Sequence, residues 1–202
     1  MTNIILIMKR LQWLLNGTIN RMYWLMNVIN FRFYHVRFCK DFRINGVLQI
    51  KNQGEIVIGN KFLANAGKSH NPIGGDTVLR LITHLPNAKI EIGNNVGMSN
   101  CSIICFDKID IGSNVLVGGG VKIWDSDFHI LNPIERKSNT GSIKIKPVKI
   151  CDNVFVGGGS IILKGLTIGE NSIVVAGSVV SKSIPSNEIW AGNPAEFVRK
   201  IK

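Results

Sequence analysis

The sequence predicts an all-β protein, a parallel β-helix in which each coil contains three six-residue repeats. Two observations predict it: aliphatic residues recur at a period of six, and glycine or asparagine follows them where a coil must turn. The longest run consists of β-branched residues, Ile150, Val156, Ile162, Ile168, Val174 and Val180. Six consecutive matches at one period indicate a repeat architecture.

A period of six has a direct physical meaning. A strand of two or three residues followed by a tight corner turns the chain by about 120°, so three repeats close a triangular coil. The aliphatic residue of each repeat points inward and stacks on its counterpart in the next coil. Corner segments such as Gly112-Ser113-Asn114 and Gly169-Glu170-Asn171 contain residues that tolerate the positive φ of such bends.

The composition agrees with one elongated, β-rich domain. The chain has 202 residues, 45% of them hydrophobic, with 21 glycines and a net charge of +11. Its cysteines form no CxxC pair and follow no secretory signal; they are Cys39, Cys101, Cys105 and Cys151. We therefore expect free thiols in a reducing cytoplasm, and neither disulfides nor a structural zinc site.

Residues 1–43 form a basic, apolar and helical segment ahead of the coils. They hold seven Lys or Arg residues against one acid, Asp41. No apolar run reaches the roughly 18–20 residues of a membrane span, and no cleavage site follows Ile4–Met8. Asn16-Gly17-Thr18 predicts a break between two helical stretches. The segment either associates with an anionic membrane surface or caps the domain; nucleic-acid binding is the weaker alternative.

The β-helix is expected over residues 44–202. Ile56-Val57-Ile58-Gly59-Asn60 suggests a first coil that starts around residue 44, and residues 64–89 lose the register as an excursion. Two further sets of repeat positions follow: Ile92, Met98 and Ile104, then Ile111, Val117 and Ile123. The step of seven between Ile104 and Ile111 implies one residue inserted at a corner.

The repeat stops after Ile123 and resumes near Val148, so a loop over residues 124–147 is extruded from the coil. Long loops in compact domains are often functional. This one contains Asp125, Asp127 and His129, and His129 is the only histidine in residues 85–202. An imidazole that titrates near neutral pH is suited to accept a proton from a hydroxyl group.

The repeat pattern, an aliphatic residue followed by Gly-x-x-small-x, resembles the hexapeptide-repeat transferase family. The resemblance is strong over residues 90–202, weak over 44–89 and absent from 1–43. It implies a left-handed coil, whereas parallel crossovers in general are right-handed. The Asp-x-Asp-x-His segment that ends at His129 resembles the sugar and maltose/galactoside O-acetyltransferase branch, in which the loop histidine is the general base.

The same resemblance suggests residues that contact the acceptor. Asp127 is favoured for substrate contact and Asp125 for a structural or orienting role, although both are also suited to shape the turn. Asn100 lies near the position of an acceptor-binding asparagine in galactoside-type relatives, but asparagine is ordinary at a corner. Trp124 either stacks on a sugar ring or shields the site.

The resemblance also implies a donor site for acetyl-CoA along the later coils. The matching positions are Gly158, Ala176, Gly177, Ser181, Lys182 and Arg199. Lys182 and Arg199 would face the nucleotide phosphates, a role that suits a cation. The segment Gly192-Asn193-Pro194-Ala195 resembles the closure of the family, and we expect a short helix over Glu196–Ile201.

These expectations combine into an acetyl-CoA-dependent O-acetyltransferase that modifies a sugar hydroxyl in bacterial surface polysaccharide synthesis. The resemblance implies a homotrimer with sites between subunits. From the basic segment 1–43 we expect a place in the cytoplasm or on the inner face of the plasma membrane, and we expect no metal and no nucleic-acid partner. The alternatives are N-acylation of an amino sugar nucleotide or of a small xenobiotic, and a β-helix without activity. A carbonic anhydrase on this coil needs three histidines for zinc, and the clear repeats lack them.

Overall fold

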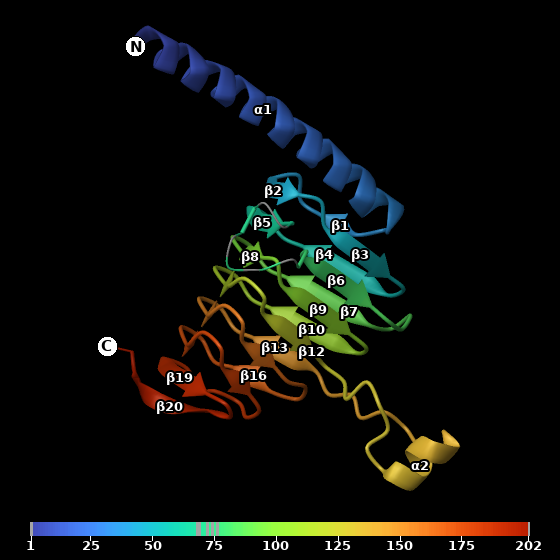
Figure 1. Cartoon of the computed structure of the whole chain (residues 1–202). Coiled ribbons are helices and arrows are strands. Elements are labelled where there is room, and N and C mark those ends of the chain that lie inside the picture. The colour runs from blue at the N-terminus through green and yellow to red at the C-terminus, as the bar shows by residue number, and fades with distance from the viewer. Residues whose placement is uncertain (1, 68–69, 72, 74, 76, 202) are drawn as a thin grey trace.

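The computed structural model describes residues 2–201 except residues 68–69, 72, 74 and 76, and describes the side chains of the first helix from Leu15 onward. Short strands stack into three sheets, which form the three sides of a coil, and a long helix lies across one end (Figure 1). We name the sheets A, B and C in the order in which the chain passes through them.

Sheet A contains β1 (Arg37–Phe38), β4 (Glu55–Ile58), β7 (Lys89–Ile92), β10 (Lys108–Ile111), β13 (Val148–Ile150) and β16 (Thr167–Ile168). Sheet B contains β2 (Phe42–Gly46), β5 (Phe62–Ala66), β8 (Gly97–Ser99), β11 (Leu116–Val117), β14 (Phe155–Val156), β17 (Ile173–Val174), β19 (Glu188–Gly192) and β20 (Ala195–Lys200). Sheet C contains β3 (Gln49–Asn52), β6 (Arg80–Thr83), β9 (Ser102–Cys105), β12 (Lys122–Trp124), β15 (Ile161–Ile162) and β18 (Val179–Val180). The helices are α1 (Thr2–Phe33) and α2 (Pro133–Ser138).

The repeat residues stack as the period of six predicts. In sheet A, Ile92 pairs with Ile111, Ile111 with Ile150 and Ile150 with Ile168, all in parallel register. Each of these side chains is at most 3% exposed. The core is therefore a set of aliphatic columns inside the coil, and every coil is stabilised mainly by its two neighbours.

The N-terminal segment is one helix, so the expected break at residues 16–18 is wrong. A Cβ added at Gly17 would meet no atom within 4 Å, and the residue is exposed. Glycine inside a helix costs only about 1 kcal/mol relative to alanine, which a 32-residue helix tolerates. Over its described residues, α1 lacks the combination of length and hydropathy that a membrane crossing requires, and so does α2.

The second half of α1 covers the open end of the coils. Phe31 is fully buried and packs against Phe38 and Phe42, with ring centroids 4.9 and 5.4 Å apart. Asn27 donates to the Gly46 carbonyl at 2.8 Å and accepts from the Leu48 N–H at 3.1 Å. The coils themselves begin at Arg37, earlier than the expected residue 44, because β1 already pairs with β4.

Two further expectations are corrected by strand pairing. The excursion is confined to residues 67–79, since β5 and β6 keep the register of β8 and β9. The short helix expected over Glu196–Ile201 is wrong: this segment is β20, which pairs antiparallel with β19. The exposed edge of β19 offers hydrogen-bond partners to the backbone of this segment. A short isolated helix is less favourable, because it gains few hydrogen bonds for the residues that it orders.

Candidate active site

The loop between β12 and β13 leaves the coil where sheet C turns into sheet A, which we call the C–A corner. Its two legs are joined by an antiparallel bridge between Ser126 and Ile145 and by a 3.0 Å hydrogen bond from the Asp127 N–H to the Lys144 carbonyl. At its tip, Asn132 caps α2 by accepting from two backbone N–H groups. The base of the loop is therefore ordered by its own backbone.

Asp125 anchors this loop to the preceding coil. Its carboxylate accepts from the N–H groups of Phe106, Asp107 and Lys108 at 2.7–3.0 Å, and it is fully buried. The thiol of Cys105 donates to the same carboxylate at 3.4 Å. These donors occupy Asp125, so it is a structural residue and does not contact a substrate.

A tight turn projects His129 from the loop. The His129 N–H donates to the Asp127 carbonyl at 2.6 Å, and Phe128 between them has φ +58°. A bulky residue in this left-handed region is strained, and such strain is concentrated at functional sites. The imidazole is exposed, and no hydrogen bond to it occurs within the described part of the chain. It is therefore free to meet a ligand.

An aromatic cluster surrounds Phe128, the residue before His129. Phe128 contacts Trp124 and Phe106 edge-on, with centroids 5.9 and 5.6 Å apart, and Phe106 stacks on His84 at 4.6 Å. These residues come from three successive coils at the C–A corner. Trp124 thus helps to hold Phe128, and through it the turn that carries His129. His84 and Phe106 lie outside the repeat positions, so the repeat pattern alone does not mark them as part of the site.

Asp127 is held by Lys164, a residue that the sequence pattern did not indicate. Lys164 lies at the C–A corner of the next coil and forms an ion pair with Asp127 Oδ1. The other oxygen, Oδ2, is buried and has no hydrogen-bond partner. The pairing of the coils indicates this contact. Ile123 pairs with Ile162, so Lys164, two residues after Ile162, lies beside the base of the loop.

Asn100 is occupied elsewhere, which contradicts the suggested acceptor contact. It is 1% exposed at the corner between sheets B and C, the B–C corner. Its amide exchanges two hydrogen bonds with the backbone of Gly67, at 2.8 and 3.1 Å. Asn100 therefore fastens the start of the 67–79 excursion.

The suggested donor residues lie at different corners. Gly158, Ala176 and Gly177 are at the B–C corner, where Ala176 and Gly177 are exposed and Gly158 is half-buried; a Cβ added at Gly177, which has φ +75°, would meet no atom within 4 Å. Ser181 and Lys182 follow β18 at the C–A corner. Arg199 lies on β20 and pairs with Ile189 on β19, so it belongs to the last two strands of sheet B. One chain therefore does not bring these residues together.

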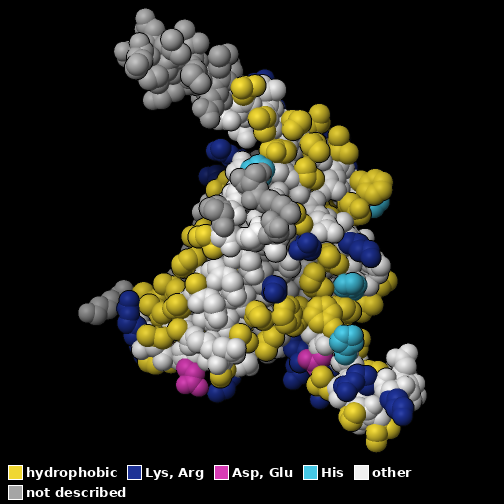
Figure 2. All heavy atoms as spheres, in the orientation of Figure 1, with side chains coloured by type: hydrophobic (Ala, Val, Ile, Leu, Met, Phe, Trp, Pro, Cys, Tyr) yellow, Lys and Arg dark blue, Asp and Glu magenta, His cyan; other side chains and the backbone are white. Residues whose placement is uncertain are grey.

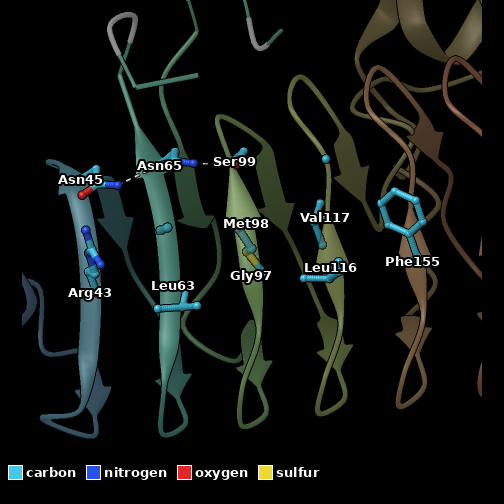
Figure 3. A pocket seen from close by; sticks show the side chains of 12 residues that line it. Arg43, Asn45, Leu63, Asn65, Gly97, Met98, Ser99, Leu116, Val117 and Phe155 are labelled. Carbon is cyan, nitrogen blue, oxygen red and sulfur yellow. Dashed lines mark hydrogen bonds between the residues drawn. The ribbon is translucent and has the colours of Figure 1, made fainter. Parts of the chain in front are cut away.

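The outer face of sheet B carries a separate shallow cavity of about 350 Å³, away from the His129 loop (Figure 3). Leu63, Leu116 and Phe155 line it, and each is 44–55% exposed. A polar row of Asn45, Asn65 and Ser99 is linked by hydrogen bonds along one side. Across the described residues, no three His, Cys, Asp or Glu side chains are grouped to bind a metal.

Curated proteins with similar sequences are named after transferase or nodulation roles. A Dictyostelium discoideum protein provisionally named an acetyltransferase is 41% identical over 57% of this chain and 63% of its own length. Nodulation protein L of Rhizobium meliloti is 38% identical over 61% of this chain and 67% of its length. The chain spans less than two thirds of the Dictyostelium protein.

Solved structures with the same coil are also similar in sequence. A maltose O-acetyltransferase from Clostridium difficile 630 is 42% identical, covers 56% of this chain and 59% of its own, and superposes with a TM-score of 0.51. A hexapeptide-repeat acetyltransferase from Vibrio cholerae, crystallised with acetyl-CoA, is 32% identical, covers 56% of this chain and 61% of its own, and superposes with a TM-score of 0.52.

The family model for the bacterial transferase hexapeptide, six repeats, matches residues 147–182. That segment contains the period-six run on which the fold prediction depends. The match, the three parallel sheets and the solved relatives confirm the left-handed parallel β-helix. The chain belongs to the hexapeptide-repeat transferase family.

Proposed function

We propose that the chain is an acetyl-CoA-dependent O-acetyltransferase that modifies a sugar hydroxyl. The observation that carries the proposal is His129, an exposed imidazole on a strained turn of the extruded loop. The names of its relatives, among them a maltose O-acetyltransferase and an acetyltransferase bound to acetyl-CoA, support the choice of donor and acceptor.

In the proposed mechanism His129 is the general base. Its imidazole takes the proton of the acceptor hydroxyl while the oxygen attacks the thioester carbonyl of acetyl-CoA. The tetrahedral intermediate collapses, the C–S bond breaks, and the CoA thiolate takes the proton back from the imidazolium. The products are the acetyl ester and CoA, so no acyl-enzyme is needed.

The coenzyme would lie along the B–C corner. Ala176 and Gly177 are exposed there beside the half-buried Gly158, and an extended pantetheine arm needs a surface without bulky side chains. Lys182 and Arg199 are exposed cations that would suit its phosphates. In a single chain they lie away from this corner. They would therefore reach the coenzyme here only from another copy of the chain, or they would contact a different part of the coenzyme.

We propose a homotrimer for the same reason. His129 is at the C–A corner and the exposed Ala176 and Gly177 are at the B–C corner, so one chain holds two halves of a site apart. A threefold arrangement of triangular coils would set the C–A loop of one copy against the B–C corner of the next.

Acyl transfer is tested with the full chain, acetyl-CoA and a panel of sugar acceptors, by following CoA release. We expect His129→Ala to lower kcat by roughly 10²–10⁴-fold, the usual contribution of a general base. Lys137→Ala, on the exposed side of α2 in the same loop, is the control and should keep full activity. Near-normal turnover in His129→Ala would refute the assignment, and activity on amino sugars alone would favour N-acylation.

The shared site is tested by mixing two inactive variants. His129→Ala keeps the B–C corner, and Ala176→Trp keeps His129 but fills that corner. Co-expression should restore about a quarter of wild-type activity, since about one pairing in four joins two intact halves. No restoration together with a monomeric mass in light scattering would overturn the trimer.

We further propose that the enzyme works in the cytoplasm beside the inner face of the plasma membrane, on precursors of surface polysaccharide. The charge asymmetry supports this location: residues 1–43 contain seven of the basic residues and one acid. Fractionation of cells that express the full chain tests it, and recovery of the enzyme entirely outside the membrane fraction at low salt would contradict it.

A further inference from the structure

Helix α1 is fixed to the coils along one side only. On that side Asn27 and Phe31 are fully buried and Val28 is 7% exposed. Asn30 adds a 2.8 Å hydrogen bond to the Leu48 carbonyl. These contacts hold the helix across the end of the β-helix, with the rest of α1 extending beyond the coils (Figure 1). The orientation of the helix is therefore set, and so is the direction of its opposite side.

The opposite side is a continuous apolar row, which we call the outer face. Its members are separated by alternating steps of four and three residues, so they lie on one line along the helix. They are 41–73% exposed: Leu15, Ile19, Met22, Met26, Ile29 and Phe33. Figure 2 shows hydrophobic side chains gathered along the described part of α1. A contiguous exposed row of this kind marks an interaction surface.

The charges around the outer face are all positive. No Asp or Glu occurs in α1. Arg21 and Arg32 each precede a residue of the outer face by one position, so both lie about 100° around the helix, on the same side of the row. An apolar row with basic residues along one side fits a surface that is apolar inside and negatively charged outside, as an anionic bilayer is.

The width of the apolar row indicates whether its partner is a membrane surface or a second helix. Leu25, 54% exposed, lies beside Met22 and Ile29 and widens the apolar sector beyond two heptad positions. A helical seam is a narrow two-position stripe, whereas an interfacial helix presents a broader sector. The outer face also points away from the coils, so a flat bilayer can lie along it without meeting them.

We infer that the outer face of α1 docks on anionic lipid and suspends the β-helix from the membrane surface. The helix lies in the plane of the headgroups and does not cross them. The inference rests on the membrane location proposed above and names the surface that makes the contact. It does not depend on acyl transfer, so lipid binding and turnover succeed or fail separately.

The test is flotation of the full chain with vesicles of phosphatidylcholine alone or with added phosphatidylglycerol. We expect binding only to the anionic vesicles and its loss as salt rises, because each arginine near the surface contributes roughly a fivefold change in affinity. Arg21→Gln with Arg32→Gln should weaken binding by about 25-fold. Ile29→Glu should weaken it more than tenfold, because it removes an apolar side chain that docking would bury and adds a negative charge.

Ile134→Glu is the matched control, since Ile134 is a 78% exposed isoleucine on the other helix. It should bind vesicles like the wild type. Circular dichroism checks that every variant keeps its coils. Equal binding to neutral vesicles, or binding unaffected by Ile29→Glu, overturns the inference. So does a fall in oligomer mass on Ile29→Glu without lipid, which would make the outer face a contact between copies of the chain.

Discussion

The position of His129 depends on residues that are distant in sequence. The turn that carries it begins at Asp127, whose carboxylate pairs with Lys164 from the next coil. Phe128, in the middle of the turn, rests on Trp124 and Phe106. A displacement of either contact would move the imidazole, and a shift of about 1 Å in a catalytic group can lower a rate 10²-fold.

Lys164→Met should therefore lower kcat of the proposed reaction by about tenfold to 10²-fold, with a smaller change in KM. Lys164→Arg keeps the charge and should recover most of the activity. Hydrogen exchange should rise in residues 126–146 of the methionine variant and stay unchanged in the coils. Unchanged exchange and unchanged kcat in Lys164→Met would show that the ion pair does not position His129.

Asp125 is expected to matter for stability. Its carboxylate satisfies three backbone N–H groups, and hydrogen bonds to a buried charged group contribute about 1.5–3 kcal/mol each. Asp125→Asn should lower the free energy of unfolding by about 3 kcal/mol in urea titrations. The comparison variant is Asp152→Asn, whose carboxylate accepts one exposed N–H, and it should cost less than about 1 kcal/mol. Equal losses would contradict the role of Asp125.

At the scale of elements, the corner between sheets A and B is built from a ladder of asparagines. Each donates its amide to the next at 2.8–3.1 Å, in the order Asn95, Asn114, Asn153, Asn171, Asn187. All five have φ between 56° and 63°. The ladder thus combines a left-handed corner, which asparagine tolerates, with a hydrogen bond between coils.

Asn171→Ala should destabilise the chain by about 2 kcal/mol, because it removes two ladder bonds and places a Cβ-bearing residue at positive φ. Asn171→Gly removes the same bonds and relieves the backbone, so it should cost about 1 kcal/mol less. Thermal unfolding of the two variants measures the difference. If alanine and glycine were equivalent, backbone conformation would not be the source of the preference.

The sequence predicts the elements that follow the repeat and misses those decided by contacts. Buried positions such as Ile92 and Ile150 follow from the period alone. The strand β20 does not, because the edge of β19 overrides local preference. The continuity of α1 through Gly17 likewise depends on the helix that surrounds it.

The candidate site was only partly predictable. The extruded loop and His129 are visible as an interruption of the repeat. Lys164 was missed because it is 37 residues from Asp127, although coil register would have located it. Asn100 was suggested from a loose resemblance, and its burial against Gly67 excludes that role.

At the scale of the whole molecule, two cysteines couple stability to pH. Burial raises the pKa of the Cys101 thiol to about 12, and burial together with the Asp125 charge raises that of Cys105 further. Unfolding exposes both thiols, so above about pH 9 the unfolded state ionises first and the folded state loses relative stability. Below that pH both thiols are protonated in the folded and in the unfolded chain, so their full contribution to the free energy of unfolding is present.

The free energy of unfolding should therefore fall between pH 8.5 and 10.5 by up to about 1.4 kcal/mol per pH unit for each of these thiols. Urea titrations at several pH values measure the slope. Cys101→Ala should reduce it, whereas Cys151→Ala, at a partly exposed position, should leave it unchanged. A slope unaffected by Cys101→Ala would exclude this thiol as its source.

The strand β20 has a consequence for how the chain behaves in crowded solution. A stack of parallel strands ends in a row of unpaired N–H and C=O groups, which can template the addition of further chains. In sheet B the last strand runs antiparallel and carries Glu196, Arg199 and Lys200 on exposed positions. Charged side chains on a terminal strand discourage edge-to-edge growth. In a chain shortened before Ala195, β19 would be an unprotected edge strand to which further chains can pair. We expect such a chain to form fibrils.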